Sequence, residues 1–87
     1  MHVVVVYDTA QKRNPKILRT CRRYLHHVQR SVFEGQLSPS QLRRFQSDVG
    51  KLLDHGHDHV IIYTLPPGAE IQRHTIGVNK PAPSDIL

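Results

Sequence analysis

Apolar and polar residues alternate in blocks along this chain, and the first blocks predict a strand followed by a helix. Residues 2 to 7 form an apolar run rich in valine, which predicts a strand that is central in its sheet and buried on both faces. Asn14 and Pro15 predict the start of a helix, with Asn14 as the cap and Pro15 as the first helical residue. Its buried face is predicted from apolar residues at helical spacing: Ile17, Leu18, Cys21, Tyr24 and Leu25.

The rest of the chain repeats this alternation of extended and helical patterns. Residues 27 to 37 have a strand pattern, and Gly35 leaves open whether they form one bent strand or two short strands. Ser38 and Gln41 predict a capping box for a second helix, which we expect to end near Gly56. Its predicted buried residues are Leu42, Phe45, Val49, Leu52 and Leu53. Residues 59 to 65 predict another buried strand, residues 71 to 78 a weaker one, and residues 79 to 87 a flexible tail.

The order of elements predicts one α+β domain over residues 1 to 78. The arrangement is that of a ferredoxin-like βαββαβ sandwich with an extra C-terminal strand. Two helices can cover only one face of such a sheet, so the other face must meet solvent, a ligand or a second copy. Because a chain of 87 residues buries a modest fraction of its surface, we expect a homodimer in which the two sheets face each other.

The charge of the chain narrows the class of partner. Twelve Lys and Arg residues against seven Asp and Glu residues give a net charge of +5, which favours nucleic acid first and an anionic membrane surface second. One face of the predicted first helix is basic: Lys12, Lys16, Arg19 and Arg23, with Arg22 at its shoulder. Such a face can simply be solvated. Its uniform sign instead favours contacts with a phosphate backbone, independent of base sequence.

Two absences in the sequence limit where the protein works. No apolar segment approaches the roughly 20 residues that cross a bilayer, and the first residues lack the charged region of a signal peptide. We therefore expect a cytoplasmic protein with no membrane partner. The single cysteine, Cys21, excludes an internal disulfide and a cysteine-based zinc site, and it is interpreted as a small core residue.

Histidines and aromatic residues offer further candidate sites. Residues 55 to 59, HGHDH, could bind zinc or nickel, but they lack a fixed ligand spacing and we interpret them as a solvated loop. His26 and His27 are adjacent and should point in different directions, and their protonation would raise nucleic-acid affinity at mildly acidic pH. Phe33 and Tyr63 are interpreted as core or dimer-interface residues rather than as platforms for stacked bases.

Three strings in this order resemble one known family. They are VVVVYD at Val3 to Asp8, VQRSVFEG at Val28 to Gly35 and VIIY at Val60 to Tyr63, and together they resemble the CRISPR-associated Cas-two family over roughly residues 1 to 78. The resemblance implies a ferredoxin-like homodimer that acts in spacer acquisition. In that role the dimer bridges the family's integrase partner and lies along duplex DNA. It also implies a metal-dependent endonuclease acting on RNA or duplex DNA.

The resemblance implies a small set of site residues. Asp8 matches the family's metal-binding and catalytic aspartate, Tyr7 its usual neighbour, Arg13 a basic position, and Phe33 the aromatic residue of the S-V-F string. The implied ion is Mg²⁺, with Mn²⁺ as its substitute. His27 and Pro15 stand where members of the family commonly have arginines, so this chain has less permanent positive charge there and we expect low activity.

One carboxylate is a small donor set for a metal ion. A bound Mg²⁺ generally needs more than one hard oxygen ligand, and the sequence offers no second carboxylate near Asp8. The residue could also be a turn aspartate that accepts hydrogen bonds from the backbone of residues 9 to 11. A two-fold dimer would pair Asp8 with its copy and give a weak, shared site.

Our main hypothesis is a homodimeric CRISPR adaptation protein that binds duplex DNA and retains weak nuclease activity through Asp8. One alternative is an endoribonuclease whose main substrate is single-stranded RNA. Another is a ferredoxin-like module that binds RNA or a small ligand without catalysis.

Overall fold

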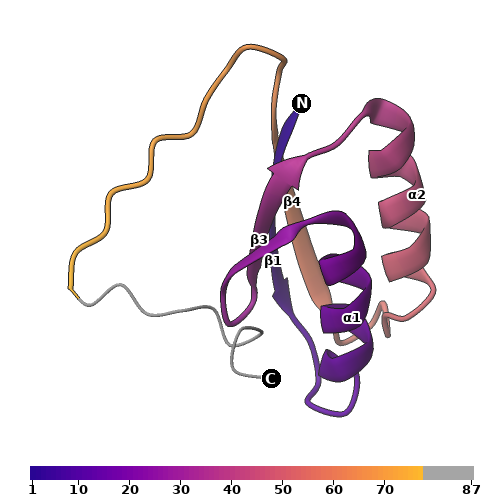
Figure 1. Ribbon diagram of the computed structural model, residues 1–87. Helices are drawn as coiled ribbons and strands as arrows, with labels where there is room; N and C mark the ends of the chain where they lie inside the picture. The colour runs from indigo at the N-terminus through magenta and orange to yellow at the C-terminus, as the bar shows by residue number, and fades with distance from the viewer. Residues whose placement is uncertain (78–87) are drawn as a thin grey trace.

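Six elements follow one another in the computed structural model, which describes residues 1–77. Figure 1 shows the strands as one layer and the two helices together on one side of it. The elements are β1 (His2–Asp8), α1 (Asn14–Tyr24), β2 (His26–Gln29), β3 (Val32–Gln36), α2 (Pro39–Gly50) and β4 (His59–Leu65). The tail expected over residues 79 to 87 lies outside the described residues.

The strands form one antiparallel sheet in the order β2-β3-β1-β4. This confirms the predicted ferredoxin-like α+β fold, with β1 central. Residues 27 to 37 contribute to two short strands joined by a turn at Arg30 and Ser31, rather than forming one bent strand. The irregularity in this hairpin lies between His27 and Gln29 rather than at Gly35. Gly35 instead makes room for a close neighbour, because a Cβ there would lie 3.1 Å from Leu25 Cδ2.

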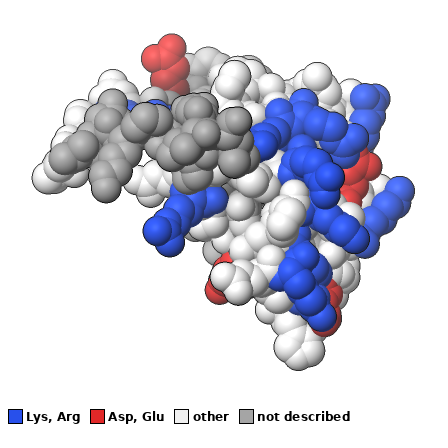
Figure 2. Space-filling view, turned by 60° about the horizontal axis from the view of Figure 1, so that its bottom comes forward, with Lys and Arg blue, Asp and Glu red and all other residues white. Residues whose placement is uncertain are grey.

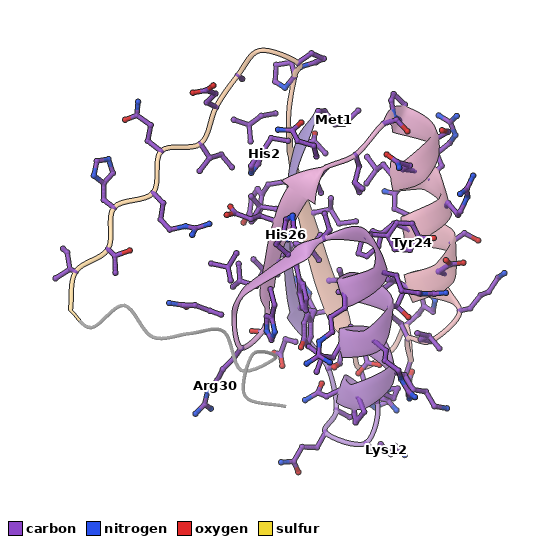
Figure 3. The ribbon with its side chains drawn as sticks, viewed as in Figure 1. Met1, His2, Lys12, Tyr24, His26 and Arg30 are labelled. Carbon is purple, nitrogen blue, oxygen red and sulfur yellow. The ribbon has the colours of Figure 1, made fainter. Side chains whose placement is uncertain are left out.

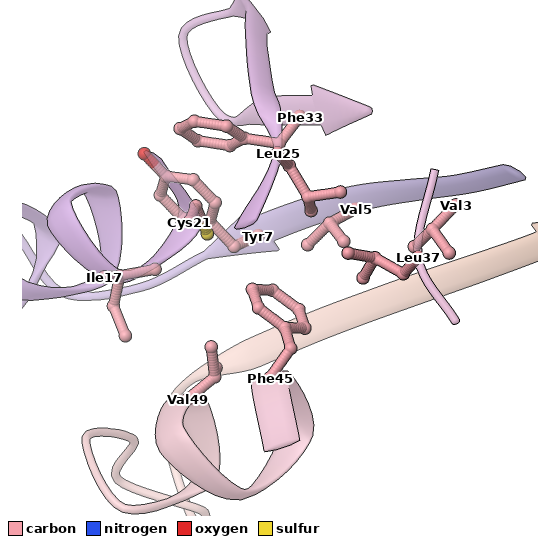
Figure 4. Packing of buried hydrophobic residues seen from close by; sticks show 10 residues of the cluster. All are labelled: Val3, Val5, Tyr7, Ile17, Cys21, Leu25, Phe33, Leu37, Phe45 and Val49. Atoms are coloured by element: carbon pink, nitrogen blue, oxygen red, sulfur yellow. The ribbon is translucent and has the colours of Figure 1, made fainter. Parts of the chain in front are cut away.

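The core lies between the helices and one face of the sheet (Figure 4). Along β1, Val3, Val5 and Tyr7 are buried, whereas Val4 and Val6 are only partly buried. The prediction that this strand is buried on both faces is therefore wrong for the single chain, since helices cover one face alone. The buried hydrophobic residues are Val3, Val5, Tyr7, Ile17, Cys21, Leu25, Phe33, Leu37, Phe45 and Val49.

Helix α1 begins differently from the prediction. Arg13 is the N-cap and makes no side-chain capping hydrogen bond, while Asn14 is the first helical residue. The Asn14 side chain is already engaged, because its Oδ1 accepts a hydrogen bond from the hydroxyl of Thr9. Pro15 lies in the first turn, where its missing N–H leaves no helical hydrogen bond unmade.

Helix α2 begins as predicted and ends earlier than predicted. The capping box forms, with 3.2 Å from the Gln41 backbone N to Ser38 Oγ and 2.8 Å from the Ser38 backbone N to Gln41 Oε1. The helix ends at Gly50, not near Gly56, which does not have a positive φ. An aspartate-organised loop follows instead, because Asp54 Oδ1 accepts a hydrogen bond from the Gly56 backbone N. Leu52 and Leu53 pack against the core from this loop.

Residues 66 to 77 leave the sheet after β4 and contain no strand. The strand expected over residues 71 to 78 is thus absent from its described part, and residue 78 lies outside it. Pro66 and Pro67 explain the departure, because they lack N–H groups and cannot extend the sheet ladder. Figure 1 shows this segment running well apart from the helices, and Arg73 forms an ion pair with Glu34 of β3. Within residues 1–77, no helix has the length and apolar character needed to cross a membrane.

Candidate functional site

Asp8 is the last residue of β1 and is exposed. Because side chains alternate along a strand, it lies on the same face as Val4 and Val6, away from the helices. Its carboxylate forms no hydrogen bond or ion pair with another residue of the described part. The backbone N of Ala10 donates to Asp58 Oδ1 at 3.1 Å, so the loop after β1 is held by a distant carboxylate rather than by Asp8. Asp8 therefore lies at a fixed position in the sheet, and its carboxylate has no partner among residues 1–77.

Two other segments reach the end of the sheet that Asp8 occupies. His59, the first residue of β4, is the register partner of Asp8 and is also exposed. The turn between β2 and β3 reaches the same end, because the Tyr7 backbone N donates to the Ser31 carbonyl at 3.0 Å. Arg30 is exposed in that turn and extends away from the hairpin in Figure 3. Arg30 was not among the predicted site residues. His59 was predicted as the first residue of a strand and also as part of a solvated loop, but not as a neighbour of Asp8, because only strand register brings these residues together.

Tyr7 and Phe33 lie on the opposite, helix-facing side of the sheet from Asp8. Phe33 is fully buried, in agreement with its interpretation as a core residue, and its ring lies 6.2 Å from that of Tyr7 and 4.3 Å from that of His27. Tyr7 Oη donates to the Arg30 carbonyl at 3.1 Å, and His27 Nε2 lies 3.0 Å from the same oxygen. Burial raises the pKa of Tyr7, which keeps its hydroxyl as a donor. These side chains thus hold the hairpin turn without contacting Asp8.

Arg13 is engaged in an ion pair rather than free to bind a ligand. Its guanidinium donates to both carboxylate oxygens of Asp58, with Nη2 2.8 Å from Oδ1. The Arg13 hydrogen bond, assisted by the backbone N–H groups of Asp54 and Ala10, lowers the pKa of Asp58 well below its usual range. Arg13 therefore stabilises the loops around the end of β1.

The side chains of residues 55 to 59 do not gather into one group of metal ligands in the described structure. In residues 1–77 there is no group of three or more His, Cys, Asp or Glu side chains that could hold a metal ion. His55 Nε2 lies 2.9 Å from the Gly50 carbonyl, and His57 Nδ1 lies 3.1 Å from Asp54 Oδ2. The side chain of Asp58 is buried, unlike that of the solvated loop residue that we predicted, and His59 belongs to β4. The residues of this run therefore contact different partners and belong to different parts of the fold.

Lys and Arg side chains gather on the helix side of the molecule (Figure 2). Lys12 precedes α1 in a turn rather than lying on the helix, but all five residues of the predicted basic face are exposed: Lys12, Lys16, Arg19, Arg22 and Arg23. A hollow of about 450 Å³ lies beside this helix, lined by Lys16, Arg19, Thr20, Arg23 and Leu52. Arg22 is not among its lining residues.

A second hollow extends this basic surface towards α2. It has a volume of about 330 Å³ and shares Arg23 with the first; its lining residues are Arg23, Tyr24, Gln36, Leu37, Gln41 and Arg44. Arg44 was not among the predicted basic residues, because only the packing of the two helices brings it to this surface. Asp48 partly neutralises the positive charge of this surface. Its carboxylate accepts a hydrogen bond from Tyr24 Oη at 2.6 Å and lies 3.7 Å from Arg23 Nη2. Lys16, Arg19 and Arg44 form no ion pair with another residue in the described range.

The sheet face opposite the helices exposes apolar side chains. Tyr63 is 55% exposed and Ile61 37% exposed, and their register partners Val4 and Val6 are partly buried. These apolar side chains lie on β1 and β4, on the same face of the sheet as Asp8 and His59. It is the surface that we expected a second copy to cover.

One chain supplies only some of the ligands that a divalent metal ion needs. Asp8 offers a hard oxygen ligand, which Mg²⁺ and Mn²⁺ accept, but a single carboxylate leaves most coordination positions to water. The residues therefore fit a metal ion if a second copy supplies a second Asp8 to the same site.

Comparison with known proteins gives consistent matches. The chain matches the family model described as CRISPR associated protein Cas2 over residues 1–70. It is 49% identical over 78 residues to the CRISPR-associated endoribonuclease Cas2 of Frankia alni, covering 90% of each chain. The protein of the same name from Thermotoga maritima is 40% identical over 80 residues, with 92% of each chain covered.

Solved structures agree with these sequence matches. A crystal structure of Cas2 superimposes with a TM-score of 0.83 at 35% identity, covering 92% of this chain and 90% of that chain. Streptococcus pyogenes Cas2 at pH 6.5 superimposes with a TM-score of 0.78 at 26% identity, covering 88% of this chain and 100% of the other.

Proposed function

Because this chain belongs to the CRISPR-associated protein Cas2 family, we propose that it is a homodimeric, divalent-metal-dependent endonuclease of a CRISPR system. The observation that supports this most directly is Asp8, an exposed carboxylate without a partner in the described chain at the end of the central strand. The curated relatives carry the name endoribonuclease, so RNA is the substrate class we propose first. A role of this kind places the protein in the cytoplasm.

The proposed site needs two copies of the chain. Burying the apolar sheet face that contains Ile61 and Tyr63 against its copy would bring two Asp8 carboxylates towards one two-fold axis. The two carboxylates would hold Mg²⁺ or Mn²⁺, which when bound polarises a phosphoryl oxygen and generates a nucleophilic hydroxide from water. Arg30, the exposed cation in the turn at the same end of the sheet, would pair with a neighbouring phosphate of the substrate.

Cleavage assays with an Asp8 variant test this proposal. Wild-type protein and Asp8→Asn are incubated with single-stranded RNA or duplex DNA in Mg²⁺, in Mn²⁺ and in EDTA. We expect metal-dependent cleavage by wild type and only background cleavage by Asp8→Asn, with Glu70→Gln as an exposed carboxylate control that retains activity. Equal cleavage by wild type and Asp8→Asn would refute the Asp8 mechanism and indicate a contaminating nuclease.

A second proposed function rests on a different surface. The basic hollows beside α1 and α2 suit phosphate backbones, and they lie on the helix side, away from Asp8. We propose that this surface binds duplex DNA while the dimer bridges the integrase partner of the adaptation complex. Co-purification with that integrase, followed by binding of duplex DNA to the complex, tests this role. Absence of a complex would favour a nuclease or binding module that acts alone.

A further inference from the structure

His59 lies directly across from Asp8 in the sheet. The two residues are the last register pair of β1 and β4, after Val6 with Ile61 and Tyr7 with Val60. Residues directly opposite in an antiparallel pair lie on the same face, with Cβ atoms about 4.5–5.5 Å apart. Both side chains are exposed. An imidazole and a carboxylate are therefore side by side at the end of the sheet, on the face away from the helices.

Neither side chain of this pair is committed elsewhere in residues 1–77. In the run from His55 to His59, His55 contacts the Gly50 carbonyl, His57 contacts Asp54, and Asp58 is bound to Arg13 and to two backbone N–H groups. His59 alone of this run has no hydrogen-bond partner for its side chain among the described residues, and the same holds for Asp8. The pair can thus bind a ligand without breaking an interaction that holds the fold together.

The donor types of this pair differ from those that suit magnesium. Mg²⁺ is bound almost entirely by oxygen ligands and keeps several waters, whereas imidazole nitrogen is a good ligand for first-row transition metals. A site with one carboxylate and one imidazole from each chain would hold two oxygen and two nitrogen donors in a dimer. Such a mixed set favours Mn²⁺ and later divalent transition metals over Mg²⁺.

We propose that His59 and Asp8 together bind a first-row transition-metal dication, so that His59 makes the site of this protein selective for Mn²⁺ over Mg²⁺. The proposal deepens the proposed nuclease function and rests on it for the use of the bound ion. The binding of the ion itself is measurable without any nuclease assay.

Electron paramagnetic resonance of bound Mn²⁺ provides the test. In wild-type protein, Mn²⁺ should bind with a single class of site, and the electron spin echo should be modulated by a directly coordinated imidazole ¹⁴N. His59→Gln should lose this modulation and bind Mn²⁺ at least about 10-fold more weakly, since even removal of groups that only orient a ligand costs 10–100-fold. Mg²⁺ affinity, measured by competition, should change less than Mn²⁺ affinity.

His57→Gln is the matched control, because His57 is an exposed histidine two residues away whose side chain is 79% exposed. It should retain both the ¹⁴N modulation and the wild-type Mn²⁺ affinity. Circular dichroism should show that each variant is folded, because both changes are at exposed positions. Unchanged Mn²⁺ binding and modulation in His59→Gln would overturn the proposal, and so would failure of the wild type to bind Mn²⁺.

The outcomes separate this proposal from the proposed function. If Asp8→Asn abolishes cleavage while His59→Gln leaves Mn²⁺ binding unchanged, the nuclease function stands and the role of His59 is refuted. If the ¹⁴N modulation depends on His59 but no variant or wild type cleaves nucleic acid, the mixed site stands and the nuclease function is refuted.

Discussion

Arg13 and Asp58 join two loops at the end of the central strand. The guanidinium of Arg13 donates to both carboxylate oxygens of Asp58, whose side chain is only 1% exposed. The same carboxylate accepts hydrogen bonds from the backbone N–H groups of Ala10 and Asp54. This ion pair therefore fixes the loop that follows Asp8 relative to the loop that precedes His59.

Asp58→Ala should lower the melting temperature by several degrees, because it leaves the Arg13 guanidinium and two backbone N–H groups without their acceptor. Arg19→Ala, which removes an exposed cation, should have little effect. Thermal denaturation followed by circular dichroism at pH 7 measures both. The double variant Arg13→Ala with Asp58→Ala should lose less than the sum of the single variants, since they share one interaction. Additive losses would contradict the pairing.

Acid should remove the stability that Asp58 contributes. The pKa of this carboxyl in the folded protein is lowered from its usual value of 3.8 by Arg13 and by backbone donors. A carboxyl with a lowered folded pKa stabilises the fold above its unfolded pKa, and this contribution is lost as the pH falls below it. Wild type should therefore lose more stability between pH 5 and pH 2 than Asp58→Asn. Urea unfolding across this range measures the difference, and parallel losses in both proteins would argue against it.

The basic surface beside the helices should bind nucleic acid through phosphate contacts. Lys16→Ala with Arg19→Ala should weaken duplex DNA binding and reduce the slope of log K against log salt by about 1.8, since each lost contact contributes about 0.9. The matched control is Arg43→Ala with Lys51→Ala, which removes the same charge from exposed positions that line neither hollow. Fluorescence anisotropy at several salt concentrations measures the slopes. If both pairs of substitutions act equally, only net charge matters and the proposed surface is wrong.

A charge on the open sheet face should prevent dimer formation. Tyr63→Asp places a carboxylate on the apolar face that we propose a second copy covers, and burying an unpaired charge there is costly. Thr64→Asp is the control, because Thr64 is the register partner of the buried Val3 and so belongs to the other face. Sedimentation velocity should show a dimer for wild type and Thr64→Asp and a monomer for Tyr63→Asp. A monomeric wild type, or a dimeric Tyr63→Asp, would contradict the proposed dimer.

Local patterns in the sequence predicted most of the fold. The apolar run ending at Asp8, the capping box of Ser38 with Gln41, and the strand from His59 to Leu65 are all present in the structure. The errors at the helix ends occurred where a side chain a few residues away takes up a group that the predicted cap or turn would use. Asn14 is not a cap because Thr9 takes its side chain, and α2 ends before Gly56 because Asp54 and Asp58 organise the loop.

The position of Asp8 could be predicted from the sequence, but the residues that surround it could not. The position of Asp8 at the end of β1 follows from the apolar run, whereas its role as a metal ligand rests on the family resemblance and stays a prediction. The basic face of α1 follows from helical spacing. Arg30 and Arg44 could not be assigned in this way, because the hairpin turn and the contact between the two helices decide what lies beside them.

The sequence by itself determined the type and order of the six elements from β1 to β4, since helical and strand periodicity arise from residues close together in the chain. Only the tertiary structure decided which side chains meet. His59 joins Asp8 because β4 pairs antiparallel with β1 in one register, and a shift by one residue would place His59 on the opposite face. Arg13 is held away from ligands because a carboxylate 45 residues further along the chain folds against it.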